Sequence, residues 1–357
     1  MKTIAVLGAG KIGRMVATFL GNGGYQVRVG DVSEEAAKLL AEKAPNAEGF
    51  RVDFKDAKTL EPVLAGAEAV LSCCPFESNP FIADQALKYD LHYLDLTEDV
   101  ETTRAVLAKV EKSKKAFIPQ CGLAPGFITI TGVHLIKPLE EVRQLKLRVG
   151  ALPRYPSNML KYNLTWSTQG LINEYGNPCE AIRDGRDVLL QPLQDLEEIM
   201  VDGVRYEAFN TSGGLGSLTR SLKGRVSDLD YKSIRYPGHN HLIRFLMDDL
   251  DMDHHREELG HIFERALPGT YQDVVVVYVS TRGTYRGRFV ERVYARTITH
   301  QVIYGENWSA IQITTAAGIC GVLDLLLEEK LPQRGFVRQE DVDYEAFIAN
   351  RFGKYYA

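Results

Sequence analysis

Cysteine is scarce in this chain of 357 residues. The five cysteines are odd in number and show no C-x-x-C spacing, which argues against a disulfide framework and a structural zinc site. A predicted strand begins within two residues of the N-terminus and leaves no room for a secretory signal. We therefore expect reduced thiols, no bound metal and a cytoplasmic protein.

Long apolar runs and a large excess of one charge are also missing. Runs such as Val274–Val277 are far too short to cross a bilayer. The formal net charge is −5, which suggests no nucleic-acid partner. Hydrophobic residues make up 45% of the chain and charged residues 25%, both ordinary for a globular protein, and the length suits two domains. We expect a small-molecule partner and no membrane.

The most informative segment present is an apolar strand, Thr3–Leu7, that runs directly into the pattern G-x-G-x-x-G. A helix-compatible run, Arg14–Leu20, follows it. In a dinucleotide-binding loop, Gly8 permits the tight turn, Gly10 lets the backbone approach the pyrophosphate, and Gly13 lets helix and strand pack closely. The helix start then directs its N–H groups at the phosphates. The residues predicted to bind the cofactor here are Gly8, Gly10, Lys11, Ile12 and Gly13.

Asp31 ends the second predicted strand, close to the offset expected of a ribose-binding acid. A carboxylate there accepts hydrogen bonds from ribose hydroxyls and repels a 2′-phosphate. Arg28 lies within the strand and is not obviously aimed at a phosphate, so the sequence favours NAD over NADP. Asp53, at the end of the third predicted strand, either reaches the adenine amino group or closes the turn at Asp56.

Strand-like and helix-like runs alternate through the first third of the chain. The predicted strands are Lys2–Leu7, Gln26–Gly30, Gly49–Asp53, Ala69–Cys74, His92–Leu96 and Ala116–Gln120. The predicted helices are Lys11–Gly21, Ser33–Lys43, Ala57–Leu64, Pro80–Tyr89 and Thr97–Lys112. Six strands separated by five helices make two mononucleotide-binding halves, and hence an α/β fold with a doubly wound parallel sheet.

The pattern changes after residue 122, where β-branched and alternating segments are typical of a mainly antiparallel sheet. Predicted strands there are Leu145–Gly150, Val274–Thr281 and Arg288–Ile298, with a hairpin turn at Thr281–Thr284. Ile311–Lys330 is predicted to be a long apolar helix that returns to the nucleotide domain. The predicted domains are therefore residues 1–122 with 312–357, and residues 123–311, the second being an α+β domain that binds substrate.

Residues just after each strand are candidates for the site, because ligands bind beyond the carboxyl ends of parallel strands. Ser72 and Cys73 either let the cofactor pass close to the backbone or are simply buried. Asp95 either binds a substrate ammonium or ties a backbone N–H. Cys121 and Gly122 begin a segment with two glycines and a proline, which suits a rigid turn against a ligand.

Arg235 and His239 stand out in the second domain, on either side of a Pro-Gly turn. Arginine binds carboxylates with a two-pronged fork. His239 is either a catalytic candidate or a helix-terminal residue in contact with water. Ser212 lies in a polar, glycine-rich loop that supplies further hydrogen-bonding groups.

These segments together resemble the saccharopine dehydrogenase-like family of NAD(P)-dependent amino-acid oxidoreductases. The resemblance covers nearly the whole chain and rests on Gly8–Gly13, Cys121–Gly126 and Ile234–His239. Within the family the chain is most similar to the lysine 6-dehydrogenase branch, which oxidises the ε-amine of L-lysine to an aldehyde that cyclises. Saccharopine reductases are longer and usually have an acid at the position of Ala124.

The resemblance implies an NAD-dependent oxidative ε-deamination of L-lysine to allysine or its cyclic imine, with release of ammonia. It implies that Arg235 binds the substrate carboxylate and that Asp95 contacts an ammonium. Asp95, His239 and Cys121 are the candidate catalytic residues, and Asp95, Gly122, Ser212 and Arg235 the candidate substrate-binding residues.

Two alternatives stay open. One is oxidoreduction of saccharopine or carboxynorspermidine, whose second carboxylate needs another cation, such as Arg154, Lys161 or Arg220. The other is a nucleotide-binding regulator without turnover. The antiparallel sheet of the second domain also offers an edge that a homodimer could cover.

Overall fold

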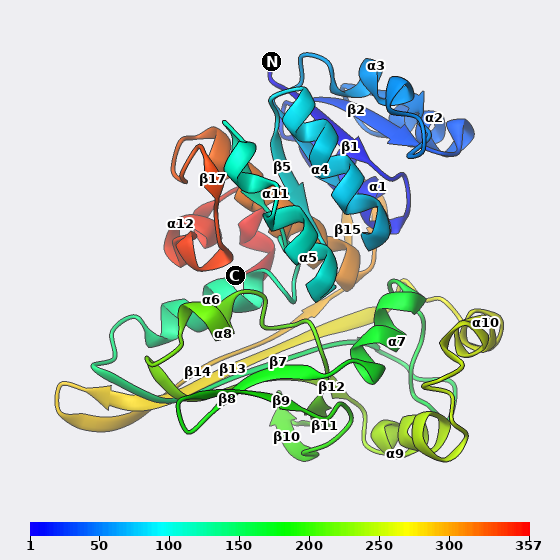
Figure 1. The fold of residues 1–357 in the computed structure, drawn as a ribbon. Coiled ribbons are helices and arrows are strands. Elements are labelled where there is room, and N and C mark those ends of the chain that lie inside the picture. The colour runs from blue at the N-terminus through cyan, green and yellow to red at the C-terminus, as the bar shows by residue number, and fades with distance from the viewer. The chain divides into compact units, whose positions relative to one another are not determined.

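A computed structural model describes all residues, 1–357, and divides them into two compact units (Figure 1). The first unit contains Met1–Phe127 and Gln312–Ala357, and the second contains Ile128–Ile311. The sequence prediction placed the first boundary at residues 122 and 123. Residues 123–127 stay with the first unit because they belong to a turn that is hydrogen-bonded to that unit's sheet.

The first unit contains a seven-stranded sheet in the order β17-β6-β5-β4-β1-β2-β3, in which all neighbouring strands are parallel. Six of these strands follow the doubly wound order that the sequence predicts. The seventh, β17, was not predicted, because two residues carry no pattern. The strands are β1 (Thr3–Leu7), β2 (Gln26–Asp31), β3 (Ala47–Arg51), β4 (Ala69–Ser72), β5 (His92–Asp95), β6 (Ala116–Ile118) and β17 (Gly335–Phe336).

Helices connect these strands. Ser33 caps α2 as its sequence position suggested, because its hydroxyl accepts a bond of 3.2 Å from the N–H of Ala36. The predicted helix Thr97–Lys112 is two shorter pieces, α5 and a 3₁₀ turn at Val110–Lys112. The helices of this unit are α1 (Lys11–Asn22), α2 (Glu34–Lys43), α3 (Glu61–Leu64), α4 (Asn79–Lys88), α5 (Val100–Leu107), α11 (Ala310–Leu327, whose first two residues belong to the second unit) and α12 (Tyr344–Ala349).

The helix α11 is long and apolar enough to cross a membrane by length and composition, but 89% of it is buried within the structure. Its one acid, Asp324, accepts bonds of 2.5 Å from Tyr25 and 2.7 Å from Asn350, and pairs with Arg351 at 2.6 Å. A buried charge that is paired and hydrogen-bonded in this way is typical of a core helix in a globular protein.

The second unit contains a mixed sheet in the order β10-β11-β12-β7-β13-β14, with the hairpin β8-β9 attached to β12. Only the pair β12 and β7 is parallel. The strands are β7 (Glu141–Pro153), β8 (Cys179–Arg183), β9 (Arg186–Leu190), β10 (Glu197–Val201), β11 (Val204–Asn210), β12 (Val226–Arg235), β13 (Asp273–Tyr285) and β14 (Arg288–Thr299). The helices are α6 (Phe127–Ile136), α7 (Thr168–Gly176), α8 (Leu218–Ser221), α9 (His239–Arg244) and α10 (Arg256–Ala266).

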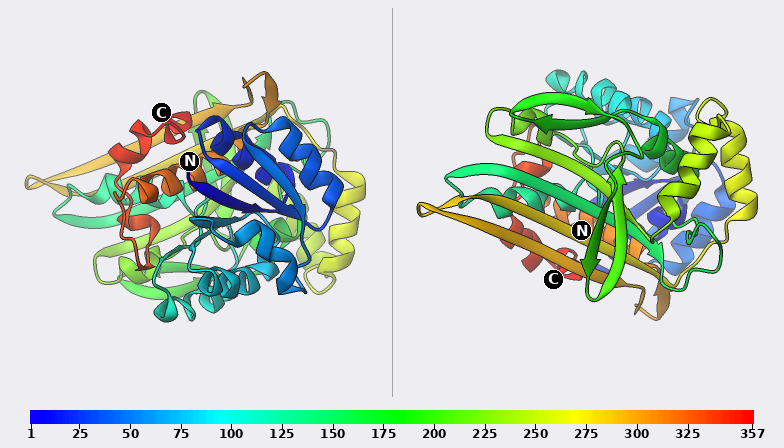
Figure 2. Two further views of the ribbon diagram at one scale, coloured as in Figure 1. Left: turned by 90° about the horizontal axis from the view of Figure 1, so that it is seen from above. Right: turned by 90° about the horizontal axis from the view of Figure 1, so that it is seen from below.

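The predicted hairpin turn at Thr281–Thr284 is wrong. These residues continue β13, and the chain reverses at Arg286 and Gly287, which have φ values of +50° and +71° (Figure 2). Two such residues make the tight turn that suits a twisted hairpin. Gly283 instead serves strand packing, because a Cβ there would lie 2.1 Å from the carbonyl oxygen of Glu141.

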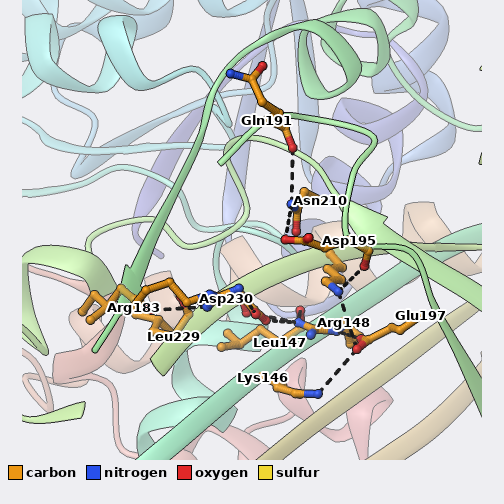
Figure 3. Close-up of polar contacts among 12 residues, drawn as sticks. Lys146, Leu147, Arg148, Arg183, Gln191, Asp195, Glu197, Asn210, Leu229 and Asp230 are labelled. Carbon is orange, nitrogen blue, oxygen red and sulfur yellow. Dashed lines mark hydrogen bonds and ion pairs between the residues drawn. The ribbon is translucent and has the colours of Figure 1, made fainter. Parts of the chain in front are cut away.

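A network of paired charges ties four strands of this sheet together (Figure 3). Arg148 of β7 lies 2.5 Å from Glu197 of β10 and 2.5 Å from Asp230 of β12. Asp230 also pairs with Arg183 of β8 at 2.6 Å. Arg148 is fully buried, so these carboxylates provide the partners that a buried cation requires. The network therefore fixes the positions of the strands.

Candidate functional site

The glycine-rich loop between β1 and α1 has the geometry that a bound dinucleotide requires. A Cβ on Gly8, whose φ is +101°, would lie 2.7 Å from the carbonyl oxygen of Cys73, and one on Gly13 would lie 1.8 Å from that of Gly8. Gly8 and Gly13 are therefore needed for packing. A Cβ on Gly10 would meet nothing within 4 Å, and Gly10 is exposed. Open space at this glycine fits the close approach of a pyrophosphate.

The start of α1 also fits a phosphate group. Gly10 is its N-cap and provides no side-chain cap, and no acid lies in the first turn. The positive end of the helix dipole therefore lies at Lys11 and Ile12, where no capping side chain occupies the helix start. Lys11 also accepts a 2.9 Å bond at its carbonyl oxygen from Gln312 of α11, which fixes the loop.

Asp31 braces this loop. One carboxylate oxygen accepts a bond of 2.6 Å from the N–H of Ala9, and the other accepts one of 2.9 Å from the N–H of Ser33. Each oxygen keeps a second lone pair, so Asp31 can still accept a bond from a ribose hydroxyl. Arg28 donates to the carbonyl oxygen of Ala65 at 2.7 Å, so its guanidinium is already engaged away from Asp31.

The other predicted cofactor residues differ in their surroundings. The backbone of Cys73 lies against Gly8, and burial raises the pKa of its thiol to about 12, so the thiol stays protonated. The Ser72 hydroxyl donates to Asn79 at 2.6 Å. Asp53 accepts a bond of 2.8 Å from the N–H of Lys55, which favours its turn-closing role over contact with adenine.

Asp95 is an internal tie in this structure. It is completely buried, and its carboxylate accepts bonds from the N–H groups of Thr97 (3.0 Å) and Gln120 (2.9 Å) and from the hydroxyl of Tyr93 (2.7 Å). Burial raises its pKa to about 6 against the opposing effect of these bonds. The arrangement favours the structural alternative over contact with a substrate ammonium.

Cys121 and Gly122 form part of the turn that follows β6. The fully buried Cys121 thiol donates to the Ile118 carbonyl oxygen at 3.0 Å, and burial holds its pKa well above the usual range. A thiol in this state is a poor nucleophile or base. A Cβ on Gly126 or on Gly318 of α11 would lie 2.0 Å or 2.6 Å from the Gly122 carbonyl oxygen, so close backbone packing defines this turn.

Glu98 is an acid that the sequence analysis did not consider. It follows β5 by three residues and is half-buried. Its pKa is raised to about 7 chiefly by burial, and the nearby charges of Asp99, Asp95 and Glu77 raise it further. A carboxyl group with a pKa near 7 at the carboxyl edge of a parallel sheet is suited to proton transfer. Its place three residues after a strand of the parallel sheet is the signal that could have identified it.

In the second unit, Arg235 and His239 lie on either side of one tyrosine, Tyr175. The guanidinium Nε of Arg235 donates to the Tyr175 hydroxyl at 2.9 Å, and that hydroxyl lies 3.0 Å from Nε2 of His239. Gly238 has a φ of +96°, a conformation that lets the intervening turn bring the two side chains together. Tyr175 comes from α7, 60 residues before Arg235, and no sequence pattern linked it to them.

Both side chains are buried, which contradicts one of the two interpretations of His239, that of a helix-terminal residue in contact with water. The exposed fraction is 3% for Arg235 and 1% for His239. Burial, and then the charge of Arg235, lower the pKa of His239 to about 3, so its imidazole is neutral at physiological pH. Arg235 has a partial counter-ion in Glu174 at 3.8 Å and lies over the ring of Tyr162 at 5.0 Å.

The remaining candidate residues of this unit are spread more widely. Ser212 donates to the Asn173 carbonyl oxygen at 3.1 Å, next to Glu174. Lys161 donates to the carbonyl oxygen of Pro237 at 2.8 Å, so it is a second cation at the Arg235–His239 turn. Arg154 lies over the ring of Tyr155 at 5.6 Å, and Arg220 is exposed in α8.

A parallel sheet of this order with this glycine loop defines a dinucleotide-binding fold. The chain matches the Saccharopine dehydrogenase NADP binding domain over residues 4–119 and the Saccharopine dehydrogenase C-terminal domain over residues 122–354. It therefore belongs to the saccharopine dehydrogenase family of amino-acid oxidoreductases.

Individual relatives agree with this assignment. The chain is 25% identical over 360 residues to saccharopine dehydrogenase (NADP(+), L-glutamate-forming) of Pyricularia oryzae, which covers 92% of this chain and 77% of that one. Its fold matches apo saccharopine dehydrogenase (L-Glu forming) from Saccharomyces cerevisiae with a TM-score of 0.79 at 15% identity, over 98% of this chain and 96% of that one. DAP dehydrogenase of C. glutamicum gives a TM-score of 0.51 at 10% identity, over 98% and 96%.

Proposed function

We propose that this protein is an NAD-dependent dehydrogenase that oxidises the ε-amine of L-lysine and releases ammonia. The observation that carries the proposal is Glu98, a carboxyl group with a pKa of about 7 beyond the carboxyl end of β5, with Asp99 and Glu77 nearby. Negative charge at the edge where the fold binds its ligands suits a substrate ammonium. Arg235 supplies the cation for the substrate's carboxylate.

The residues of the chain have distinct roles in this proposal. Gly8, Gly10 and Gly13 hold the dinucleotide, whose nicotinamide supplies the hydride acceptor when bound. Glu98 accepts a proton from the substrate ammonium, because an ammonium has no lone pair with which to form an imine. Water then adds to the imine, and ammonia leaves the same carbon.

Saccharopine oxidation is the second candidate, and two observations favour it. The relatives of P. oryzae and S. cerevisiae bear that name, and Lys161 adds a second cation at the Arg235–His239 turn. A substrate with further carboxylates would use that cation. The two reactions differ in their products, since L-glutamate-forming cleavage of saccharopine yields glutamate where lysine deamination yields ammonia.

The test is to incubate the purified protein with L-lysine, saccharopine and a panel of other amino acids, each with NAD or NADP, and to follow the reduced cofactor by absorbance. We expect turnover of L-lysine with stoichiometric ammonia and a cyclic imine that an aromatic amine reagent traps. Turnover of saccharopine with glutamate as product, without turnover of lysine, would replace the proposal by its alternative.

The preference for NAD is proposed from Asp31, whose negative charge lies at the loop, and from Arg28, whose guanidinium is engaged by the carbonyl oxygen of Ala65. The names of the relatives and of the matching domain point instead to NADP. Comparison of kcat/KM for the two cofactors decides between them. If Asp31 excludes the 2′-phosphate, Asp31→Ser should reduce the preference for NAD over NADP. A wild-type kcat/KM that is equal or higher with NADP would show that Asp31 does not exclude the 2′-phosphate.

A further inference from the structure

Tyr175 lies in the middle of a hydrogen-bond chain whose direction is fixed by chemistry. Nδ1 of His239 lies 2.7 Å from the carbonyl oxygen of Leu160, which can only accept, so Nδ1 carries the proton. Neutral His239 then has a lone pair at Nε2, and the Tyr175 hydroxyl must donate to it across 3.0 Å. Arginine can only donate, so the same hydroxyl accepts from Nε of Arg235.

The hydrogen-bond chain from Arg235 through Tyr175 to His239 is buried along its whole length. The exposed fractions are 1% for Tyr175 and His239 and 3% for Arg235, so bulk water does not compete for these bonds. Tyr175 also contributes its ring, whose centroid lies 5.7 Å from the Arg235 guanidinium carbon. Burial holds the pKa of the Tyr175 hydroxyl above its usual range, which keeps the donated proton in place.

The three side chains come from three separate elements. Tyr175 lies near the end of α7, Arg235 is the last residue of β12, and His239 is the first residue of α9. A second bond from Arg235 runs from Nη1 to the carbonyl oxygen of Ile234 at 2.8 Å, and Nη2 lies 3.8 Å from Oε2 of Glu174, an ion pair longer than a hydrogen bond. Holding Nε and Nη1 therefore sets the plane of the guanidinium and the direction of Nη2.

We propose that Tyr175 is a positioning residue of the substrate site, which aims the Arg235 guanidinium at the substrate carboxylate by using neutral His239 as its hydrogen-bond acceptor. The carboxylate part of this inference rests on the proposed function. It changes the role of His239: the lone pair of Nε2 is occupied by Tyr175 and the proton of Nδ1 by Leu160, so His239 acts through Tyr175 rather than as a base.

The first test is spectroscopic and needs no turnover. Long-range ¹H–¹⁵N correlation of ¹⁵N-histidine-labelled protein, with His239 assigned by mutation, should show the Nδ1–H tautomer in the wild type. Tyr175→Phe keeps the ring but removes the donor to Nε2, so the Nε2 resonance should shift. Tyr236→Phe is the matched control. The hydroxyl of Tyr236 donates to the carbonyl oxygen of Pro153 at 3.0 Å and takes no part in the hydrogen-bond chain.

The second test is kinetic and uses the amino acid that the wild type oxidises best. Tyr175→Phe should raise KM for that amino acid by about tenfold, the effect of a weakened charge-assisted hydrogen bond, and leave the Kd of the dinucleotide unchanged. Tyr236→Phe should change neither.

An Nε2–H tautomer in the wild type, or an unshifted resonance in Tyr175→Phe, would overturn the hydrogen-bond chain. A shifted resonance with an unchanged KM would overturn the positioning role, leaving Tyr175 structural. If the wild type oxidises no amino acid, the proposed function fails, and the resonances of His239 still decide whether the chain exists.

Discussion

Two acids three residues apart, Asp95 and Glu98, have different surroundings in the first unit. Asp95 ends β5, where its carboxylate accepts three hydrogen bonds from within the protein. Glu98 lies beyond the strand, where burial and then neighbouring acids raise its pKa against the opposing effect of one backbone hydrogen bond, from its own N–H. Asp95 is thus held by the sheet, whereas the half-buried Glu98 is the acid that we propose for contact with the substrate.

The pH profile of turnover tests Glu98. A base must be deprotonated, and the pKa of Glu98 is about 7, so kcat should rise as the pH increases through 7. Groups that contribute to this pKa are Asp99, Asp95 and Glu77. Glu98→Gln should lower kcat by about a hundredfold or more and remove this rise. Measurement of kcat against pH for both proteins checks the expectation.

The control is Glu101→Gln, which removes an exposed acid of α5 that is paired with Arg104. We expect its pH profile to match the wild type. A separate rise of kcat/KM toward about pH 10 should persist in all three proteins, because it reflects the ammonium of free lysine. If Glu98→Gln keeps the wild-type kcat at pH 7, Glu98 is not the base.

The sequence identified candidate residues in groups whose members lie within a few positions of one another. Arg235 and His239 are four residues apart, and their turn could be read from the sequence. Tyr175 could not, because its link to them depends on how α7 packs against β12. Burial also could not be read from the sequence, and burial is what makes His239 neutral and Cys121 unreactive.

At the scale of helices and strands, features that depend on residues a few positions apart could be predicted from the sequence. Features that depend on a distant segment could not. The β1–α1 loop follows from its glycines, because each position has a steric reason within a few residues. The turn at Thr281–Thr284 failed because Gly283 is needed by the strand opposite it, at Glu141. The strand β17 forms only because β6 is available to pair with it.

The glycines of the loop give a prediction that separates folding from binding. Gly13→Ala would place a Cβ 1.8 Å from a backbone oxygen, so this variant should be destabilised by about 1–3 kcal/mol or more. Gly10→Ala meets no protein atom, so it should keep its thermal stability and bind the dinucleotide at least tenfold more weakly, because the methyl group occupies the pyrophosphate's space. Thermal unfolding and cofactor titration of both variants provide the measurements. A Gly10→Ala variant that loses thermal stability along with dinucleotide affinity would contradict the assignment of Gly10 to binding and Gly13 to folding.

At the scale of the whole molecule, the division of the chain depends on contacts that join its two ends. Predicted and observed units differ at residues 123–127, which the turn after β6 holds against α11 through Gly318. The position of this boundary could not be read from composition, since the segment is as apolar as the helix α6 that follows. The return of residues 312–357 was expected from the long apolar helix alone.

The second sheet leads to a prediction about assembly. β14 is the last strand in its sheet and has 12 residues, with Phe289 and Val293 exposed by 61% and 49%. A long edge strand is a surface that a second copy can extend through its backbone groups, and we propose a homodimer that pairs through β14. Light scattering after gel filtration should then give twice the 39.9 kDa of one chain.

A Phe289→Lys, Val293→Lys double variant should be monomeric, because charged side chains on an edge oppose pairing. The control Met200→Lys changes an equally exposed side chain on the opposite edge strand, β10, which has five residues. A monomeric wild type, or a double variant that still dimerises, would show that β14 is not the interface.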